Sequence, residues 1–317
     1  MKIRNLQIAK NTERGSATVT ALIVVGVAAI VITGLIWRQQ IQIRNIETTR
    51  DRTQAQWLQH GMIDFARLVL AQDLRVNQVD HLAESWSLPL SDSKVADFLK
   101  NVDIPDELQA VTVNGGITDA QGLFNLSNLW DGNYQINANG VLAYSRLLTA
   151  LGINSNLAQQ TAQMAQENQM AFYDVNDLIG VPGYTPAMIQ TLRSYVSVLP
   201  IPTTININTA SAEVLMAVFA GLSRSSANSI VQNRSNSPAK SLEEINTLLM
   251  RSGAGTNVTV DASLVNVNSQ YWFASSEVKL GSGIFRNSSL IQRSLSPMAL
   301  GNYTQVVWNR TSRILSE

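Results

Sequence analysis

The longest apolar stretch of the chain is Ser16–Trp37, which contains no charged residue. As a helix, a run of this length rises about 33 Å, enough to cross a bilayer core of about 30 Å. Val, Ile, Leu and Ala dominate it, and Gly26, Gly34 and Thr20 are small positions that let another helix approach closely. The pattern predicts a transmembrane helix.

The short segment before this run is basic. Its charged residues are Lys2, Arg4, Lys10, Glu13 and Arg14. Because short segments rich in Lys and Arg stay on the cytoplasmic side, we expect the N-terminus in the cytoplasm if the source is bacterial. The bulk of the chain, after Trp37, is then expected in the periplasm.

Three kinds of N-terminal segment fit a basic head and an apolar run. A cleaved secretory signal is disfavoured, because the run is long and no small-x-small cleavage site follows Trp37. A plain single-pass anchor remains open. So does a type IV pilin-like leader, which is cut just before the apolar run; Arg14-Gly15-Ser16-Ala17 resembles such a junction.

The next segment, from Ile41 to about Gln72, has helical periodicity and contains no proline. Its apolar positions recur at steps of three and four, which marks one face of a helix. They are Ala55, Leu58, Met62, Phe65 or Ala66, and Val69. With no breaker after Trp37, the span and this segment are expected to form one helix of about 57 residues, roughly 85 Å long.

Alternating patterns appear in two separate parts of the chain. Val111 and Val113 alternate before Asn114-Gly115-Gly116, which is a turn signal, and Ile117 resumes the pattern. The second part begins after Val265. There we expect strands at Trp272–Leu280, Ile284–Arg293 and Tyr303–Arg310, with Gly281–Gly283 as a turn.

Between these parts the periodicity is helical. The expected helices are Leu142–Leu151, about Asn154–Met170, Asp174–Ile179, Thr185–Tyr195, Ser211–Phe219, Arg224–Arg234 and Ser241–Met250. Several are joined by an apolar-Gly-apolar turn, which suggests a weak internal repeat of helical hairpins. Strands on both sides of this block can share one sheet.

The predicted fold is therefore α+β: a long, pilin-like N-terminal helix packed on an antiparallel sheet, with a large all-α domain inserted between strands. The expected boundaries are 1–15 for a leader, 16–37 for the membrane half of the helix and 38–72 for its amphipathic half. An α/β domain takes 73–129 and 266–317, and the inserted helical domain, with helix-hairpin-helix-like units, takes 130–265.

Composition argues against several functions. The 23 basic and 23 acidic residues cancel, so no global charge points to nucleic acid. There is no Cys, which excludes disulfides and thiol catalysis, and His60 and His81 are the only histidines. No Ser-His-Asp order, phosphate loop or paired-carboxylate motif stands out, so we expect a non-enzymatic protein.

Several short motifs give the chain a family resemblance. They are Gly15-Ser16 with its apolar run, Gly122-Leu-Phe-Asn-Leu126 with Asn128-Leu129, Leu199-Pro200, Ile205-Asn-Ile-Asn-Thr-Ala210, Glu213-Val-Leu-Met216 and Ser276-Glu277-Val278. In order and spacing they resemble the type II secretion system protein K family, whose members are minor pseudopilins. The Ile-Asn-Ile-Asn-Thr-Ala run is the most specific of them.

The resemblance implies a role in assembly. Such proteins are expected to form the tip complex of a periplasmic pseudopilus with the minor pseudopilins I, J and H, which drives export of folded cargo across the outer membrane. A prepilin peptidase at the inner membrane is expected to cut between Gly15 and Ser16 and to methylate Ser16.

Two residues depart from the usual pilin pattern. Ser16 stands where Phe or Met is usual, and Thr20 stands where most pilin-like proteins have Glu. The protein K family characteristically lacks that Glu. A carboxylate in the membrane without a partner costs about 2.5–3.5 kcal/mol, and a subunit with nothing ahead of it offers no amino terminus to pair with.

The resemblance also raises calcium as a ligand. Calcium takes six to eight oxygen ligands, several of them charged. The comparable stretch here, Gln159–Asp177, is rich in Gln rather than acids. Asp131, Asp261 and Glu277 are weak candidates, so the metal site stays unknown and no cofactor is assigned.

The rival function is a membrane-anchored DNA-uptake protein, because Ser211–Arg234 resembles a helix-hairpin-helix. Its turn has a single glycine, Gly221, with only Arg224 close by. From Trp130 to Val265 six basic residues face eight acidic ones, a balance of −2, whereas phosphate binding needs positive clusters. We therefore expect no nucleic-acid partner.

Overall fold

The structure is a computed structural model, and it describes residues 13–98, 106–109, 111–255, 257–281, 283–294, 296 and 302–315. The chain forms two compact units, Met1–Gln56 and Trp57–Glu317. The first twelve residues of the predicted leader lie outside the described part.

The first element is a single helix, α1, Glu13–Val76, of 64 residues. It starts before and ends after the limits that periodicity predicts, because neither Pro nor a Gly-rich stretch interrupts it. The side chains from Val19 to Trp37 are mostly exposed and apolar. In the described part of the chain, α1 is the one helix that is long and apolar enough to cross a membrane.

Five strands form the main sheet, in the order β1-β2-β9-β10-β11, and each pair of neighbours is antiparallel. They are β1 (Leu90–Lys94), β2 (Thr112–Asp119), β9 (Tyr271–Leu280), β10 (Gly283–Arg293) and β11 (Thr304–Leu315). Because β2 and β9 pair directly, the roughly 150 residues between them leave the sheet and return to it.

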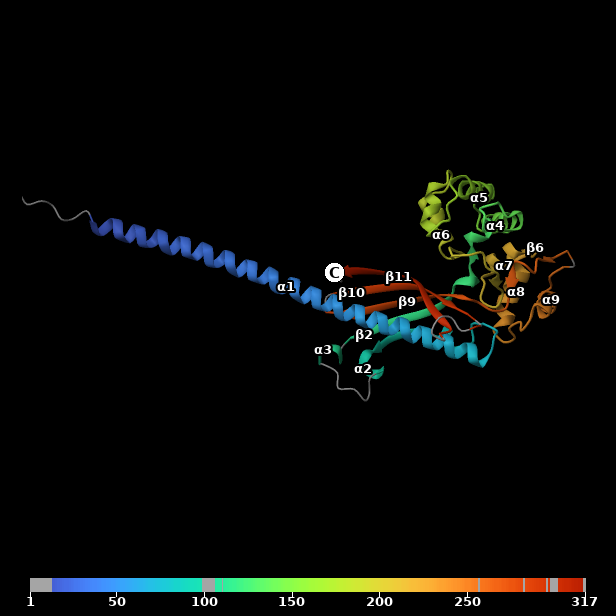
Figure 1. Cartoon of the computed structure of the whole chain (residues 1–317), viewed down its shortest axis with the longest axis horizontal. Helices are drawn as coiled ribbons and strands as arrows, with labels where there is room; N and C mark the ends of the chain where they lie inside the picture. Colours follow the sequence, from blue (N-terminus) through green and yellow to red (C-terminus); the bar gives the residue numbers. More distant parts are fainter. Residues whose placement is uncertain are drawn as a thin grey trace, which may run out of the picture. The chain divides into compact units, whose positions relative to one another are not determined.

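Helices are the main regular structure of that inserted block. Its helices are η2 (Ala120–Gly122), η3 (Leu126–Leu129), α4 (Ala138–Ala150), α5 (Leu157–Asn168), η4 (Val175–Gly180), α6 (Pro186–Leu192), α7 (Ala212–Val218), α8 (Arg224–Arg234) and α9 (Leu242–Arg251). Before the block lie η1 (Ser85–Ser87), α2 (Val95–Phe98) and α3 (Asp106–Gln109). Figure 1 labels most of these elements.

Three two-stranded pairs also lie within the block, and periodicity missed them because each strand has only two residues. They are β3 (Phe124–Asn125) with β4 (Val196–Ser197), β5 (Ile205–Asn206) with β8 (Val265–Asn266), and β6 (Phe219–Ala220) with β7 (Thr259–Val260). A single apolar core runs through the block, with Phe124, Tyr144, Leu215 and Ile230 among its fully buried members.

Side-chain caps explain where several of these helices begin. Thr185 accepts the amide of Met188 and Ser211 accepts the amide of Val214, as expected of N-cap residues. At α9, Ser241 accepts the amide of Glu244, but the Glu244 carboxylate accepts the amide of Lys240 rather than that of Ser241. The predicted start of this helix is confirmed, although its capping pattern differs.

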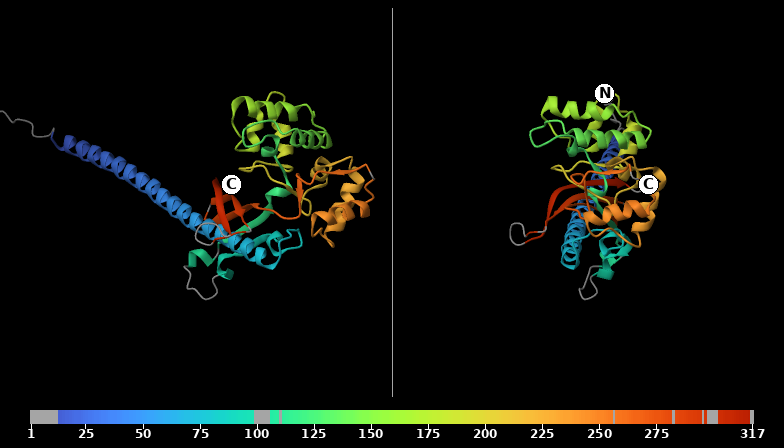
Figure 2. Two further views of the ribbon diagram at one scale, coloured as in Figure 1. Left: turned by 45° about the vertical axis from the view of Figure 1, so that its right-hand side comes forward. Right: turned by 90° about the vertical axis from the view of Figure 1, so that its right-hand side faces the viewer.

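The C-terminal part of α1, from Trp57 onward, lies along one face of the main sheet (Figures 1 and 2). Ala66 and Leu70 of the helix pack there against Trp272, Ala274 and Ile291. The opposite face of the sheet carries a second apolar cluster around Tyr271 and Leu290. Burial on both faces explains why β10 is mostly buried along its length.

The prediction of a turn at Asn114–Gly116 is wrong, because β2 runs straight through these residues. The reason is the approach of the helix to the sheet. A Cβ at Gly115 would stand 2.8 Å from the Cε atom of Met62 in α1 and 2.9 Å from the Ser275 carbonyl oxygen. The glycine serves close packing of backbone and helix rather than chain reversal.

The contact between α1 and the sheet predicts a contrast between two neighbouring leucines. Leu70 is fully buried, whereas Leu68 is 65% exposed. Leu70→Ala should lower the free energy of unfolding by about 2–5 kcal/mol, because it leaves a cavity against the sheet. Leu68→Ala should change it by less than about 0.5 kcal/mol. Urea unfolding followed by tryptophan fluorescence measures both, and equal effects would contradict the packing described.

Candidate functional site

The motif Ile205–Ala210 lies beside β8, the short strand from which the inserted block leads back into β9 of the sheet. Ile205 and Ile207 are fully buried in the core of the block, and β5 pairs in parallel with β8. Asn206 and Asn208, which alternate with these isoleucines, are buried as well. Buried side-chain amides need hydrogen-bond partners. Asn208 bonds within the helical block, whereas Asn206 bonds to segments next to α1, β2 and β9.

Asn208 fixes the motif to the helical block. Its side chain donates to the Ala239 carbonyl oxygen (2.9 Å) and accepts the Ala239 amide (3.0 Å), as a strand neighbour would. The buried Arg234 guanidinium donates to the carbonyl oxygen of Ile207 at 2.7 Å. Burial lowers the pKa of Arg234 to about 10, so the side chain remains charged at neutral pH.

Asn206 fixes the motif to the rest of the chain. Its Nδ2 lies 2.9 Å from Asp119 Oδ2, 3.1 Å from the Asp80 carbonyl oxygen and 3.2 Å from Ser269 Oγ. Asp119 ends β2, Asp80 follows α1, and Ser269 precedes β9. One asparagine side chain therefore connects three segments that are far apart in sequence.

Asp119 is the main acceptor of this group. Besides Asn206, it accepts Thr209 Oγ1 at 2.6 Å, Ser269 Oγ at 2.7 Å and the Gln121 amide at 2.8 Å. Burial raises the pKa of the Asp119 carboxyl, and the hydrogen bonds from Thr209 and Ser269 counteract that rise. The bonds hold the end of β2 against the motif.

Arg293, at the end of β10, adds an ionic part to the network. Its Nη1 donates to Asp73 Oδ2 at 2.8 Å, and its Nη2 donates to Asp80 Oδ1 and to the Ser269 carbonyl oxygen. The guanidinium also lies 4.8 Å from the centre of the Trp272 ring. All these side chains are buried, so we call the set Asp73, Asp80, Asp119, Asn206, Ser269 and Arg293 the buried network.

Carboxylates outnumber cations here. Burial is the largest cause that raises the pKa of Asp73 and of Asp80, and for Asp80 the pKa rises to about 7 even though the Arg293 guanidinium opposes the rise. At neutral pH the Asp80 carboxyl therefore carries a proton part of the time. This reduces the excess negative charge that the single Arg293 guanidinium does not neutralise.

Asp73, Asp80 and Glu84 present oxygens within 4.8 Å of one another, the arrangement of a metal-ligand group in the described part of the chain. The donors around them fit an ion pair better. Glu84 accepts the His81 amide, Trp86 Nε1 and Asn77 Nδ2, while Arg293 binds the two aspartates. We assign no metal to this group.

The weak calcium candidates are not brought together. Asp131 accepts the amides of Asn133 and Gln135 in a turn, and Asp261 accepts Asn139 Nδ2 and the amide of Ser263. Glu277 lies on β9 and pairs with Arg286 at 2.8 Å. Each carboxylate has a local structural role, and none belongs to the metal-like group found among the described residues.

Gly15, Ser16 and Thr20 all lie in α1, and Thr20 is exposed. The processing of Gly15 and Ser16, and the meaning of Thr20, stay predictions.

Two exposed apolar surfaces lie on the C-terminal part of α1. The first, which we call the outer stripe, consists of Trp57, Gly61, Phe65 and Leu68. At about 100° per residue these positions fall within an arc of about 80°, and that arc lies about 170° from the buried Ile63, Ala66 and Leu70. The helix therefore has one apolar face on the sheet and another facing outward.

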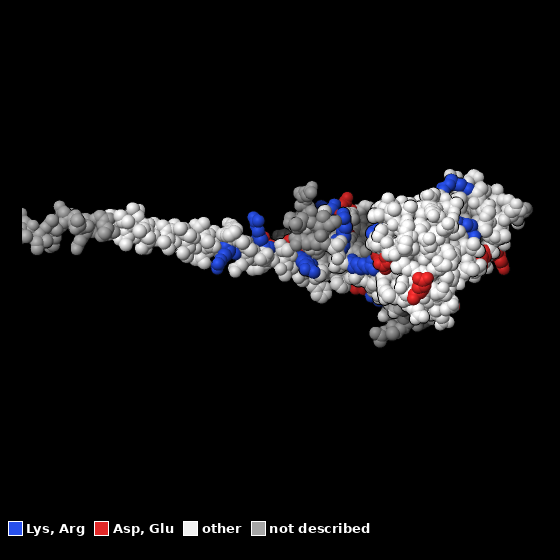
Figure 3. Space-filling view, turned by 90° about the horizontal axis from the view of Figure 1, so that it is seen from above, with Lys and Arg blue, Asp and Glu red and all other residues white. Residues whose placement is uncertain are grey.

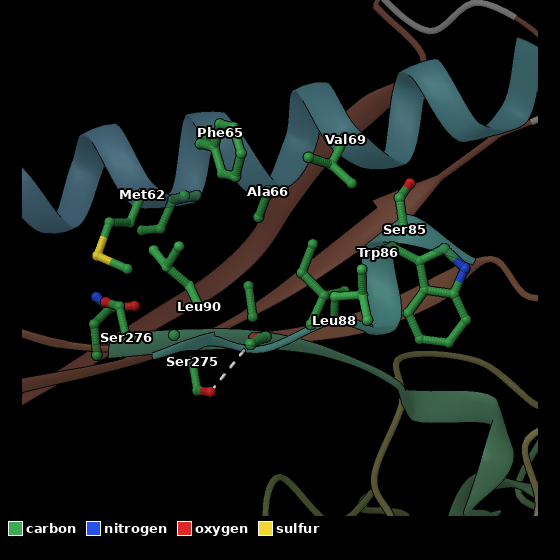
Figure 4. Close-up of a pocket in the computed structure, with 16 residues that line it drawn as sticks. Met62, Phe65, Ala66, Val69, Ser85, Trp86, Leu88, Leu90, Ser275 and Ser276 are labelled. Carbon is green, nitrogen blue, oxygen red and sulfur yellow. Dashed lines mark hydrogen bonds between the residues drawn. The ribbon is translucent and has the colours of Figure 1, made fainter. Parts of the chain in front are cut away.

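The second surface is an apolar cleft between α1 and the sheet (Figure 4). Met62, Phe65, Ala66 and Val69 line its helix side, and Leu88, Leu90 and Trp86 approach from the segment after α1. Among the described residues, those that line this cleft carry no titratable side chain. Its chemistry suits packing of an apolar partner rather than catalysis.

Comparison with known proteins decides the family. The family model described as type II secretion system (T2SS), protein K matches residues 205–267. The chain is 30% identical over 303 residues to the type II secretion system protein K of Pseudomonas aeruginosa (strain PAO1), and the match covers 85% of both chains. The chain belongs to the type II secretion system protein K family. It is thus a protein of the minor pseudopilin class, and the predicted family is confirmed.

A solved structure of the protein K family has the same fold. The chain matches a chain in the crystal structure of the GspK-GspI-GspJ complex from the enterotoxigenic Escherichia coli type 2 secretion system with a TM-score of 0.64. The match covers 84% of this chain and 99% of that one at 19% identity, so it bears on fold alone. The α+β fold predicted from the sequence is confirmed.

Sequence reasoning found the motif of the protein K family but not its partners. Asn206 and Asn208 were singled out as part of Ile205–Ala210, whereas Asp73, Asp80, Asp119 and Arg293 were not. Asp73, Asp119 and Arg293 sit at the ends of a helix or strand, and Asp80 lies in the loop after α1; at such places a charged residue is normally expected to face solvent. Only the fold shows that those ends meet.

The buried network predicts a large effect of removing its cation. Arg293→Met should destabilise the folded chain by about 3–5 kcal/mol, because two buried carboxylates lose their partner. Arg286→Met, which breaks the exposed pair with Glu277, is the matched control on the same strand and should cost less than about 1 kcal/mol. Denaturant unfolding gives both values; similar small costs would show that the network contributes little.

The raised pKa of Asp80 predicts a pH dependence of stability. From about pH 4, near its ordinary pKa of 3.8, to about pH 7, the folded chain keeps a proton that the unfolded chain has released. The free energy of unfolding should therefore fall as the pH rises through this window. In Asp80→Asn the fall should be shallower, and urea titrations at several pH values test this. Identical slopes in the two proteins would contradict the assignment.

Proposed function

We propose that this chain is a non-enzymatic minor pseudopilin that joins the I and J subunits, with H, in the tip complex of a periplasmic pseudopilus, which drives export of folded cargo across the outer membrane. The observation that carries the proposal is the outer stripe on α1. The solved relative assembles with GspI and GspJ, as its description states, and the outer stripe offers this chain a surface for equivalent partners.

The outer stripe has the form of a helix-docking surface. Trp57 is 75% exposed and Leu68 is 65% exposed, an unusual position for large apolar side chains in a folded unit. Their spacing presents a ridge to a neighbouring helix, and Gly61 between them leaves room for close approach. A partner helix with an apolar face of the same period would cover the stripe.

The N-terminal part of α1 supports an inner-membrane location with the N-terminus in the cytoplasm. On this proposal a prepilin peptidase cuts between Gly15 and Ser16, Ser16 becomes the methylated terminus, and the apolar part of α1 stays as the anchor. Exposure of the side chains from Val19 to Trp37 fits contact with lipid or with other helices.

A DNA-binding role is the alternative, and the contacts of two arginines disfavour it. At the hairpin of α7 and α8, the Arg224 guanidinium pairs with Glu213 at 2.6 Å and donates to the Ala150 carbonyl oxygen. Arg234, at the other end of α8, is buried on the Ile205–Ala210 motif. Charged side chains on the face shown in Figure 3 are scattered over a mostly uncharged surface. This favours protein partners over phosphate.

Assembly with I and J tests the proposal. The full-length chain in detergent should co-purify with the I and J pseudopilins of the same bacterium. Leu68→Asp should reduce the complex at least tenfold, because it places a charge in the covered surface. Met250→Asp, at an even more exposed apolar position on α9, should leave it unchanged. No complex with the unaltered chain would refute the proposal.

Thr20 allows a separate test of the tip position. Thr20→Glu should insert into the membrane but impair assembly and secretion, because a subunit at the tip has no neighbour ahead whose amino terminus could pair with the carboxylate. Thr20→Gln, of similar size without the charge, is the control. Normal secretion by the Glu variant would count against the tip position.

A further inference from the structure

β11 forms one edge of the main sheet, and many of its described side chains are exposed. It has 12 residues and pairs with β10 on one side. Residues 305–307 and 309–312 are exposed, whereas the paired strand β10 is mostly buried. The strand contains neither Pro nor Lys, two of the residues that commonly protect edges, and its one bulge lies near its start.

The hydrogen bonds of β10 show which backbone groups of β11 face outward. The Arg293 amide donates to the Gln270 carbonyl oxygen, on the β9 side. The Ser294 amide donates to the Tyr303 carbonyl oxygen, on the β11 side. Because the backbone groups of successive strand residues face alternate neighbours, the amides and carbonyls of Arg286 and Ser288 in β10 also point toward β11. These two residues pair with Ser312 and Arg310. It follows that the amides and carbonyls of Asn309 and Thr311 point away from the sheet.

The beginning of β11 confirms this alternation. After the bulge, Gln292 of β10 pairs with Gln305, so the carbonyl oxygen of Thr304 should face outward. It does, because Arg67 of α1 donates to it at 3.1 Å. Arg67 of α1 therefore satisfies the first outward-facing carbonyl of the edge. The outward-facing backbone groups of Asn309 and Thr311 lie further along the strand.

Side-chain contacts hold this open stretch in place. Asn309 Oδ1 accepts Asn287 Nδ2 (2.5 Å) and Ser289 Oγ (3.1 Å) from β10. Arg310 pairs with Asp174 of the inserted block, and its guanidinium lies 4.5 Å from the centre of the Trp308 ring. An edge that is fixed before binding loses little conformational entropy when a partner strand is added.

We propose that the edge of β11 around Asn309–Thr311 accepts an extended segment of a partner protein as a sixth strand. Backbone groups of Asn309 and Thr311 would supply the hydrogen bonds, and the exposed Val306 and Val307 would contact apolar side chains of the added segment. On the function proposed above, the segment belongs to an I or J pseudopilin, and β11 is a second contact beside the outer stripe.

Charge favours such a partner over a second copy of this chain. The sequence of β11 contains Arg310 and Arg313 and no acidic residue. Pairing two copies of the strand would bring like charges close together, which destabilises neighbouring strands. Arg310 is about half exposed beside its partner Asp174, so its guanidinium can also pair with a carboxylate of an added segment. The partner is thus expected to be an alternating segment with at least one acidic residue.

Proline and valine at one position test the proposal in the full-length chain. Thr311→Pro removes an outward amide that β10 does not use, so the sheet should persist. It should weaken binding of purified I and J pseudopilins at least tenfold. Thr311→Val keeps the amide and should bind as the unaltered chain does. Equal binding by the Pro and Val variants would overturn the proposal.

Amide exchange gives a readout that needs no variant. In the free chain, the amides of Arg310 and Ser312 should already be protected by β10, while those of Asn309 and Thr311 exchange quickly. Binding of I and J should slow exchange at Asn309 and Thr311 at least tenfold. If the complex forms and is sensitive to Leu68→Asp but these two amides stay fast, the β11 contact is wrong and the proposed function stands. If no complex forms, both fail.

Discussion

The buried guanidinium of Arg293 is the interaction on which the arrangement of the folded unit most depends. It binds carboxylates from the last turn of α1 and from the loop that follows, and it does so from the end of β10. A buried cation with two buried anions is stable only while all three are present. Through Ser269, Asp119 and Asn206, the same network reaches the Ile205–Ala210 motif. Helix, sheet and inserted block are therefore joined at one place.

A second constraint comes from α1 itself. Past Trp57 it has to pack on the sheet with one face, and Gly115 permits the close approach that this packing needs. The opposite face keeps Trp57 and Leu68 exposed, which is unfavourable in an isolated subunit. A helix with two apolar faces makes sense in a subunit that completes its burial by assembly. The open edge of β11 likewise leaves backbone groups of the sheet available to a partner strand.

Much of the fold could be predicted from periodicity. Long uninterrupted helical and alternating patterns gave α1, β9 and β10, because each repeats its burial pattern many times. The turn expected at Gly115 failed, since a glycine that makes room for Met62 has the same local signal as one that reverses the chain. The strand β1 was missed because its five residues are largely exposed and lack an apolar alternation.

The residues of the site also divide into those that a sequence pattern reveals and those that only the fold brings together. Asn206 was found through its motif, and Thr20 through its place in the apolar run. Asp80 and Arg293 are 213 residues apart, and only the sheet topology and the end of α1 bring them together. Sequence spacing carries no information about such a pair. The direction of the Asp80 pKa shift likewise depends on burial, which is a property of the whole fold.

We infer that α1, the sheet and the inserted block form one cooperative unit through the buried network. Native-state hydrogen exchange at increasing urea concentration tests it most directly. In a cooperative unit, the amides of Ile63–Leu70 in α1, of β9 and of Ile205–Asn208 should open with the same free energy and the same urea dependence. If the Ile205–Asn208 amides instead open at a clearly lower free energy while α1 and β9 stay protected, the inserted block folds independently and the claim is wrong.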